Sequence, residues 1–351
     1  MEQLVIRGQD SIIQLKSLLV GRHLQRVALV CGQHVLDTHD SLFKQLAIDF
    51  STTIVTPNGI LEERLLPAFE RKLLGADSIV AIGGGRTIDF GKVLLYHLPT
   101  GSVKPYFIAV PTTAGSGSEA TSFAVIYKQG VKYSLDHPRL LPDLVLLDPI
   151  LLEGLSTYQK AVSGIDAMAQ CIESIWNKNA NPESLAYAEK GLEILWNKLP
   201  SFVKGDSSIA PGIAEGAYLS GKAINITKTT GPHALSYYLT SNYGVDHGQA
   251  VATFLPLFFA YNFEDVTDEI TNSRRQLIYQ ILNLKNQDGV EHIKKFIRGL
   301  GLSINLEDFG IPKDVVPEII ASVNGERFNN NPVAFNAERM QKMILKHCYS
   351  S

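Results

Sequence analysis

Short apolar runs alternate with helix-like segments through the first half of the chain, and this alternation restricts the fold more than any other feature of the sequence. The runs are rich in β-branched residues and end near glycine or proline, as buried strands do. They cover residues 26–32, 51–59, 77–85 and 143–149, with one more run that begins at Tyr106. Helical spacing appears between them, at residues 40–50, 60–76 and 87–98. Repeated strand–helix–strand units predict a parallel sheet with helices on both faces.

After about residue 152 the strand pattern gives way to long stretches with helical periodicity, such as residues 182–203 and 274–284. A chain of 351 residues is long enough for two domains. We therefore predict an α/β domain at residues 1–154 and an all-α domain at residues 155–351.

The charge and the cysteines argue against several classes of protein. The formal net charge is −3, so no basic field calls for nucleic acid. Cys31, Cys171 and Cys348 are far apart and odd in number, which argues against a disulfide framework and for a reducing compartment. The first residues are too charged for a signal peptide, and we find no apolar run of membrane-spanning length. We expect a cytoplasmic protein without membrane or nucleic-acid partners.

Two loops follow predicted strands and are rich in small residues. Gly83, Gly84 and Gly85 connect a strand to a helix, where backbone N–H groups and the helix N-terminus favour a phosphate. A tight structural turn would explain these glycines equally well. The second loop, residues 111–121, carries small hydroxyl side chains. Two such loops at the carboxyl ends of neighbouring parallel strands are where a dinucleotide would lie.

A second group of residues has the chemistry of metal ligands. Asp166 and Gln170 are four residues apart and therefore share one helical face. His233 and His247 follow downstream, and oxygen and imidazole ligands together suit a divalent first-row metal. Each residue also has an ordinary explanation, since Asp166 would serve as a helix cap and the histidines as satisfied core residues.

The stretch "GKAINITKTTGPHALSYYL", residues 221–239, has the small and apolar residues of a buried helix but also carries Lys222 and Lys228. Cations near a core are costly unless an anion meets them. The alternatives are that the two lysines reach solvent or pair with acidic residues.

These segments together resemble the iron-containing alcohol dehydrogenase family, which is related to the dehydroquinate synthases. The resemblance rests on "GGGRTIDFGK" (83–92), "PTTAGSGSEAT" (111–121), "SGIDAMAQCIES" (163–174), "PHALSYYLTSNYGVDHG" (232–248) and "NNNP" (329–332). It implies an N-terminal dinucleotide-binding domain, a helical C-terminal domain and a metal in the cleft between them.

The resemblance also implies the roles of individual residues in the metal site. Asp166, His233 and His247 match metal ligands, whereas Gln170 stands where the family has a fourth histidine. A neutral amide oxygen weakens the case for Fe²⁺ in particular, so Fe²⁺ and Zn²⁺ both stay open. Tyr237 replaces a histidine that relays protons, and we assign it and Lys228 to catalysis.

For the cofactor, the resemblance implies NADPH or NADH. The expected binding residues are Gly83, Gly84, Gly85, Asp89, Thr112, Thr113, Ser116, Ser118 and Lys132. Gly32 and Gln33 replace the acidic residue that often reads the ribose 2′-hydroxyl, so NADPH is expected to be accepted, unless Gly32 is only a turn residue. Arg86 replaces a serine and would either add charge near the phosphates or point to solvent.

The lysines and "GVKYSL" (130–135) resemble the phosphonoacetaldehyde reductase branch of the family, which reduces an anionic aldehyde to 2-hydroxyethylphosphonate. We predict that Lys228, Asn225, Lys222 and Arg327 bind this substrate, helped by threonine hydroxyls, and that the protein is a homodimer. The alternatives are a general short-chain alcohol dehydrogenase, a dehydroquinate synthase relative, and a nucleotide-binding member that has lost its metal.

Overall fold

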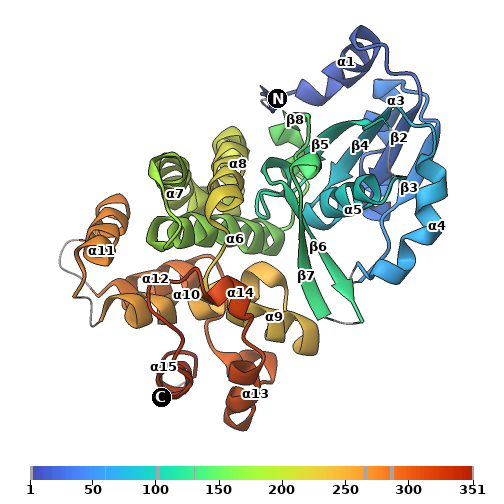
Figure 1. Ribbon diagram of the computed structural model, residues 1–351. Helices are drawn as coiled ribbons and strands as arrows, with labels where there is room; N and C mark the ends of the chain where they lie inside the picture. Colours follow the sequence, from blue (N-terminus) through green and yellow to red (C-terminus); the bar gives the residue numbers. More distant parts are fainter. Residues whose placement is uncertain are drawn as a thin grey trace. The chain divides into compact units, whose positions relative to one another are not determined.

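The computed structural model describes residues 3–59, 61–99, 103–129, 131–264, 267–284 and 288–349, apart from the side chains of residues 131 and 132. The chain divides into two compact units, residues 1–154 and residues 155–351 (Figure 1).

The described residues of the first unit form a six-stranded sheet in the order β1-β8-β5-β4-β2-β3, in which all neighbouring strands are parallel. The strands are β1 (Leu4–Arg7), β2 (Val27–Cys31), β3 (Thr52–Val55), β4 (Ser78–Gly83), β5 (Tyr106–Pro111) and β8 (Leu144–Leu147). The predicted parallel α/β fold is therefore confirmed. Strand β1 was not predicted, because its four residues carry too short a pattern.

Both faces of the sheet are covered, which explains why its inner strands are continuously apolar. Along β2, Val27, Leu29 and Cys31 belong to one hydrophobic cluster, together with residues of α1 (Leu15–Gly21), α2 (Gln33–Thr38) and α3 (Asp40–Leu46). Ala28 and Val30, on the opposite face, pack in a second cluster with α5 (Gly85–Tyr96). This alternation is the period of two that a strand imposes.

One prediction about local structure in this unit was wrong, and one pair of strands was not predicted. The expected helix at 60–76 is a series of short pieces: a 3₁₀ helix at Glu63–Leu65, α4 (Pro67–Glu70) and a second 3₁₀ helix at Arg71–Leu73. Pro67 lacks an N–H group and so can start a helix but not continue one. An antiparallel pair, β6 (Phe123–Lys128) and β7 (Val131–Asp136), was also missed.

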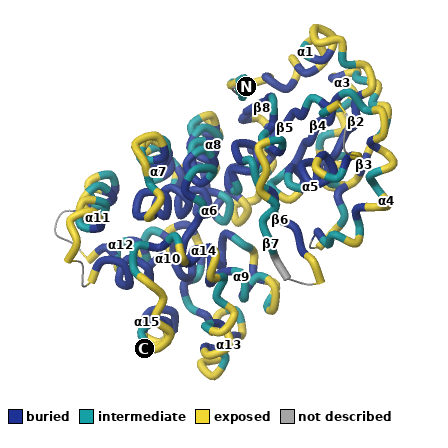
Figure 2. Tube along the Cα trace, in the orientation of Figure 1, coloured by how far each residue is buried: buried dark blue, intermediate teal, exposed yellow. Residues whose placement is uncertain are grey.

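Within the described part of the second unit, every regular element is helical, as predicted. The helices are α6 (Thr157–Trp176), α7 (Pro182–Val203), α8 (Ala210–Thr227), α9 (Gly231–Tyr243), α10 (His247–Phe263), α11 (Glu269–Ile281), α12 (Gly289–Gly299), α13 (Val316–Ala321), α14 (Gly325–Phe328) and α15 (Ala337–His347). Helices α6 and α10 are buried over most of their length, whereas α7 and α11 have exposed faces (Figure 2). Among the described helices, none combines the length and apolarity needed to cross a membrane.

Candidate active site

Asp166 lies in the middle of α6 and is only 6% exposed. The helix begins at Thr157, where Ser156 and Gln159 form a reciprocal capping box. Because the helix start is fixed nine residues earlier by Ser156, the alternative that Asp166 is a helix cap is wrong. A buried carboxylate inside a helix needs partners from other elements.

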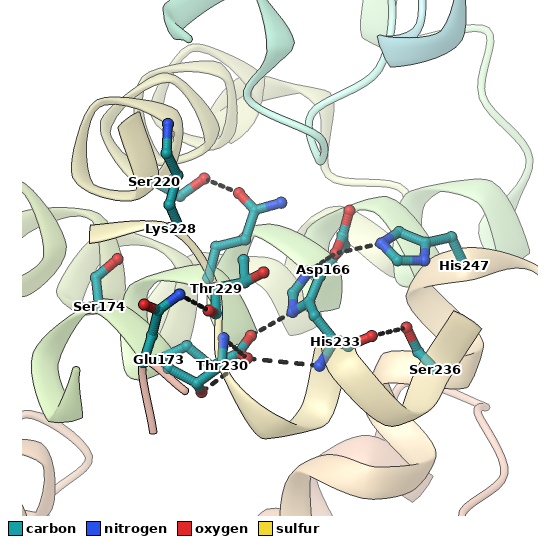
Figure 3. Close-up of polar contacts among 12 residues, drawn as sticks. Asp166, Glu173, Ser174, Ser220, Lys228, Thr229, Thr230, His233, Ser236 and His247 are labelled. Carbon is teal, nitrogen blue, oxygen red and sulfur yellow. Dashed lines mark hydrogen bonds and ion pairs between the residues drawn. The ribbon is translucent and has the colours of Figure 1, made fainter. Parts of the chain in front are cut away.

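Those partners come from the first turns of α9 and α10 (Figure 3). His233 Nε2 lies 3.2 Å from Asp166 Oδ1, and His247 Nε2 lies 3.9 Å from the same oxygen. Gly248 explains the close approach of α10 to α6, since a Cβ at this position would lie 1.9 Å from the carbonyl oxygen of Val162. The structure thus brings together three residues that are up to 81 positions apart in sequence (247 − 166 = 81).

The donor set of Asp166, His233 and His247 fits a divalent metal. Their ligand atoms all lie within 4.8 Å of one another. Ligands bound tetrahedrally at about 2.1 Å would be about 3.4 Å apart, so small side-chain movements suffice. His233 lies between two carboxylates, and although burial opposes the shift, Glu173 and Asp166 raise its pKa to about 9. The two carboxylates on either side of this ring favour a positive charge there, which a metal cation would supply.

Glu173 contacts the candidate ligand His233, and the sequence analysis assigned it no role. It is fully buried, and its Oε2 contacts His233 Nδ1, on the side of the ring away from Asp166. A carboxylate at this position fixes the tautomer and orientation of a metal-binding histidine. The available signal was its place in the sequence, seven residues after Asp166, which puts both side chains on one face of α6.

Gln170, the predicted fourth ligand, lies one turn after Asp166 and is 3% exposed. Its Oε1, the atom that would coordinate a metal, accepts a hydrogen bond of 2.8 Å from Ser220 Oγ. The carbonyl oxygen has a second lone pair, so this bond orients Gln170 without excluding it as a ligand.

Tyr237 contacts both a candidate metal ligand, His247, and a buried cation, Arg327. Its ring stacks on His247 with a centroid separation of 6.1 Å and an interplanar angle of 19°. Its phenol interacts with the side chains of Arg327 and Thr229, and Arg327 is only 6% exposed. Burial raises the pKa of Tyr237, and the Arg327 guanidinium partly opposes that rise. Tyr237 therefore lies between Arg327, a predicted substrate residue, and His247, a candidate metal ligand.

The turn between α8 and α9, residues 228–230, is held by the end of α6. The N–H and hydroxyl groups of Thr230 both donate to Glu173 Oε1, at 2.8 and 3.0 Å. Trp176 Nε1 donates to Thr230 Oγ1 at 2.8 Å, and Ser174 Oγ lies 3.0 Å from Thr227 Oγ1. The hydroxyls of Thr227 and Thr230, expected to help bind substrate, therefore have protein partners and stabilise the turn.

The predicted substrate residues on this segment have different surroundings. Lys228 lies in the turn itself, on the Ser220 side of the view in Figure 3, with His247 on the other side. Asn225, on α8, is partly buried. Lys222 Nζ lies 5.2 Å from the centre of the Tyr187 ring, so a cation–π contact accounts for this lysine.

The nucleotide-binding candidates lie in the first unit, after β4 and β5. Helix α5 begins at Gly85, and its N-cap residue Gly84 has no side-chain cap, so the first-turn N–H groups suit a phosphate. A Cβ at Gly85 would lie 2.3 Å from Ser116 Oγ, and one at Gly84 would lie 3.2 Å from Thr113 Oγ1. These glycines therefore also let the two loops approach each other, as the turn alternative proposed.

Asp89, on α5, links this helix to the second loop and to β6. It accepts hydrogen bonds from Ser118 Oγ and, at 3.0 Å, from the N–H of Val125. We therefore assign Asp89 to positioning the second loop. Thr112 is buried at the end of β5, and the side chain of Lys132 lies outside the described part of the structure.

Gly32 follows β2 directly and is the N-cap residue of α2. Gln33 Nε2 donates to Asp37 Oδ1 at 2.8 Å. The exposed Asp37 carboxylate therefore lies one helical turn after Gln33, where the acidic residue that reads the ribose 2′-hydroxyl is missing. Arg86 is exposed and donates to the carbonyl oxygen of Gly59 at 3.0 Å.

Comparisons with known proteins identify the family of the chain. The family model for iron-containing alcohol dehydrogenase matches residues 3–149, and the model for the C-terminal part of the Fe-containing alcohol dehydrogenase family matches residues 160–348. The chain belongs to this family. It is accordingly an NAD(P)-dependent, metal-dependent alcohol dehydrogenase, and its family resemblance is confirmed.

Several relatives are similar over most of their length. A phosphonoacetaldehyde reductase from Streptomyces viridochromogenes is 30% identical over 74% of this chain and 73% of its own. Long-chain-alcohol dehydrogenase 1 from Geobacillus thermodenitrificans is 28% identical over 69% of this chain and 67% of its own. The solved structure of an iron-containing alcohol dehydrogenase from Thermococcus thioreducens superposes with a TM-score of 0.87 at 25% identity, covering 99% of this chain and 98% of that one.

Proposed function

We propose that this dehydrogenase reduces a small aldehyde that carries an anionic group, with phosphonoacetaldehyde as the candidate substrate. The observation that carries the proposal is the buried Arg327 guanidinium, which contacts the Tyr237 phenol beside His247. A buried guanidinium is costly unless an anion or polar groups meet it, and it binds phosphonate oxygens in a bidentate manner. Lys228, in the turn that Glu173 anchors, is the second proposed cation.

The relatives support this reading without deciding it. The Streptomyces relative is named for an aldehyde that bears a phosphonate. Another relative, from Sphingobium indicum, is a maleylacetate reductase and is 29% identical over 71% of this chain and 67% of its own. Relatives named for neutral substrates, such as the long-chain-alcohol dehydrogenase, leave the general dehydrogenase as the alternative.

Each part of the site has an assigned task. Asp166, His233 and His247, with Gln170 as a fourth donor, would hold one divalent ion, which when bound polarises the carbonyl group as a Lewis acid. Glu173 orients the His233 ring. Reduction needs a proton in addition to the hydride, and we assign its delivery to the Tyr237 phenol. We propose that NADPH is accepted as well as NADH, and that the enzyme is a cytoplasmic homodimer.

The test is a comparison of kcat/KM for phosphonoacetaldehyde and for propanal, with either cofactor and with metal supplied. A charge-assisted contact contributes on the order of 1.5–3 kcal/mol. Arg327→Gln should therefore lower kcat/KM for phosphonoacetaldehyde by roughly tenfold to a hundredfold more than for propanal. Lys190→Ala, which removes an exposed lysine that pairs with Glu193 on α7, is the matched control and should leave the ratio unchanged. A wild-type enzyme that prefers propanal would remove the proposal.

A further inference from the structure

Lys228 has a backbone conformation that a residue with a side chain rarely adopts. Its φ is 62° and its ψ is −178°. Asp10 and Ala47 also have positive φ, but their ψ values of 16° and 44° belong to the ordinary left-handed region. A positive φ with an extended ψ is accessible almost only to glycine, so Lys228 is strained.

The neighbouring elements enforce this conformation from both sides of the residue. The N–H of Lys228 continues the α8 ladder, donating to the carbonyl oxygen of Ile224 at 2.8 Å. Only residues 228–230 then separate α8 from α9. The start of α9 packs closely against α10, because a Cβ at Gly231 would lie 1.9 Å from the Phe258 ring. The chain must therefore pass from α8 to α9 within residues 228–230.

Asn177, at the end of α6, fixes the strained peptide. Its Nδ2 donates to the carbonyl oxygens of Thr227 and Lys228, at 3.1 and 3.2 Å, and the side chain is 4% exposed. The Thr227 hydroxyl donates to the same Lys228 carbonyl at 2.9 Å. Two donors thus hold the carbonyl oxygen in the orientation that the unusual ψ requires.

We propose that Lys228 determines specificity from this strained turn, that its backbone conformation lowers the stability of the protein, and that Asn177 is its positioning residue. The hydrogen bonds that fix this backbone conformation also fix the direction of the Lys228 Cα–Cβ bond, which narrows the region that the side chain can reach. This inference rests on the proposed function, because the group that Lys228 binds is the anionic end of the aldehyde.

Two substitutions at Lys228 separate the side chain from the backbone. Lys228→Ala and Lys228→Gly both remove the ammonium group, but only glycine relieves the strain. Glycine usually makes a protein less stable than alanine at the same position, so a Lys228→Gly variant that is more stable than Lys228→Ala would be unusual. We expect Lys228→Gly to melt at least about 2 °C above Lys228→Ala in matched calorimetric scans. If the melting temperature of the glycine variant is equal to or below that of the alanine variant, the claim that Lys228 is strained is wrong.

The same two variants test the specificity role. Both should reduce the ratio of kcat/KM for phosphonoacetaldehyde to that for propanal by at least about tenfold. A melting-temperature gap with an unchanged ratio would show that the turn is strained but would overturn the role of the side chain. Failure of the proposed function is a separate result, because it appears in the wild-type enzyme as a preference for propanal.

Asn177→Ala tests the positioning role. It should lower the ratio between the two aldehydes severalfold while kcat/KM for propanal stays within about twofold. Asn197→Ala is the control, since Asn197 is exposed on α7 and its Nδ2 donates to the carbonyl oxygen of Glu193, away from the turn. If Asn177→Ala folds poorly, Asn177→Asp keeps the acceptor for the Asn179 N–H but donates nothing to Lys228. Equal losses on both aldehydes in either variant would make Asn177 merely structural.

Discussion

Glu173 joins two functions in a single side chain. One carboxylate oxygen contacts the candidate ligand His233, and the other accepts the N–H of Thr230, two residues after Lys228. A buried carboxylate with these partners is satisfied without a counter-cation from solvent. The metal ligand and the strained turn therefore share one rigid support, so a change at Glu173 should affect both.

We predict that Glu173→Gln lowers the affinity of the metal-free protein for Zn²⁺ by roughly tenfold to a hundredfold. The amide still accepts from Thr230 through its oxygen, but it presents an N–H group to the His233 ring in place of a carboxylate. Titration of the apoprotein with competing chelator measures this without turnover. Glu183→Gln, an exposed change on α7, is the control. Wild-type affinity in Glu173→Gln would show that another group orients His233.

At the scale of elements, the predictable features were those that depend on local pattern. Strands β2, β4, β5 and β8 were predicted because burial on both faces gives each a continuous apolar run. The edge strand β3 has only one buried residue and was predicted from its β-branched residues and the turn signal after it. The error at 60–76 arose because helical spacing was given more weight than Pro67. The contacts of Glu173 with His233 and of Asn177 with Lys228 span 60 and 51 residues. No local pattern encodes such contacts, because they depend on how α6, α8 and α9 pack.

The loop after β5 contains a buried acid whose ionisation should make stability depend on pH. Glu119 lies in the 3₁₀ helix Ser118–Ala120 and is 3% exposed. Burial raises its pKa from 4.5 to about 7, although Lys92 favours the charged form. Because the folded state holds this proton more tightly than the unfolded state, the free energy of unfolding falls as the pH rises between these two values.

Glu119→Gln should therefore stabilise the protein at pH 8 and not at pH 4. A shift of this size corresponds to at most about 3 kcal/mol. Urea unfolding across this pH range, followed by a probe of the first unit, gives the difference between variant and wild type. Glu153→Gln, an exposed change in the same unit, is the matched control. A difference that does not grow between pH 4 and pH 8 would contradict a buried, protonated Glu119.

At the scale of the whole molecule, the candidate binding residues for the metal and for the nucleotide belong to different units. The candidate metal ligands Asp166, His233 and His247 all belong to residues 155–351, whereas the loops after β4 and β5 belong to residues 1–154. A ligand stabilises only the states that bind it. Each ligand should therefore protect its own unit first, and this can be measured without any substrate.

We predict that Zn²⁺ slows amide hydrogen exchange in α6, α9 and α10 of the metal-free protein but leaves β4 and α5 unchanged. At a free metal concentration of 100 Kd, binding adds about 2.7 kcal/mol to the free energy of every local unfolding event that separates the candidate metal ligands. NADPH without metal should give the converse pattern, with protection centred on α5 and the loop after β5. His247→Ala removes one ligand while leaving the nucleotide loops intact, so it should abolish the first pattern and keep the second. Protection by Zn²⁺ that persists in His247→Ala would mean that the metal binds elsewhere.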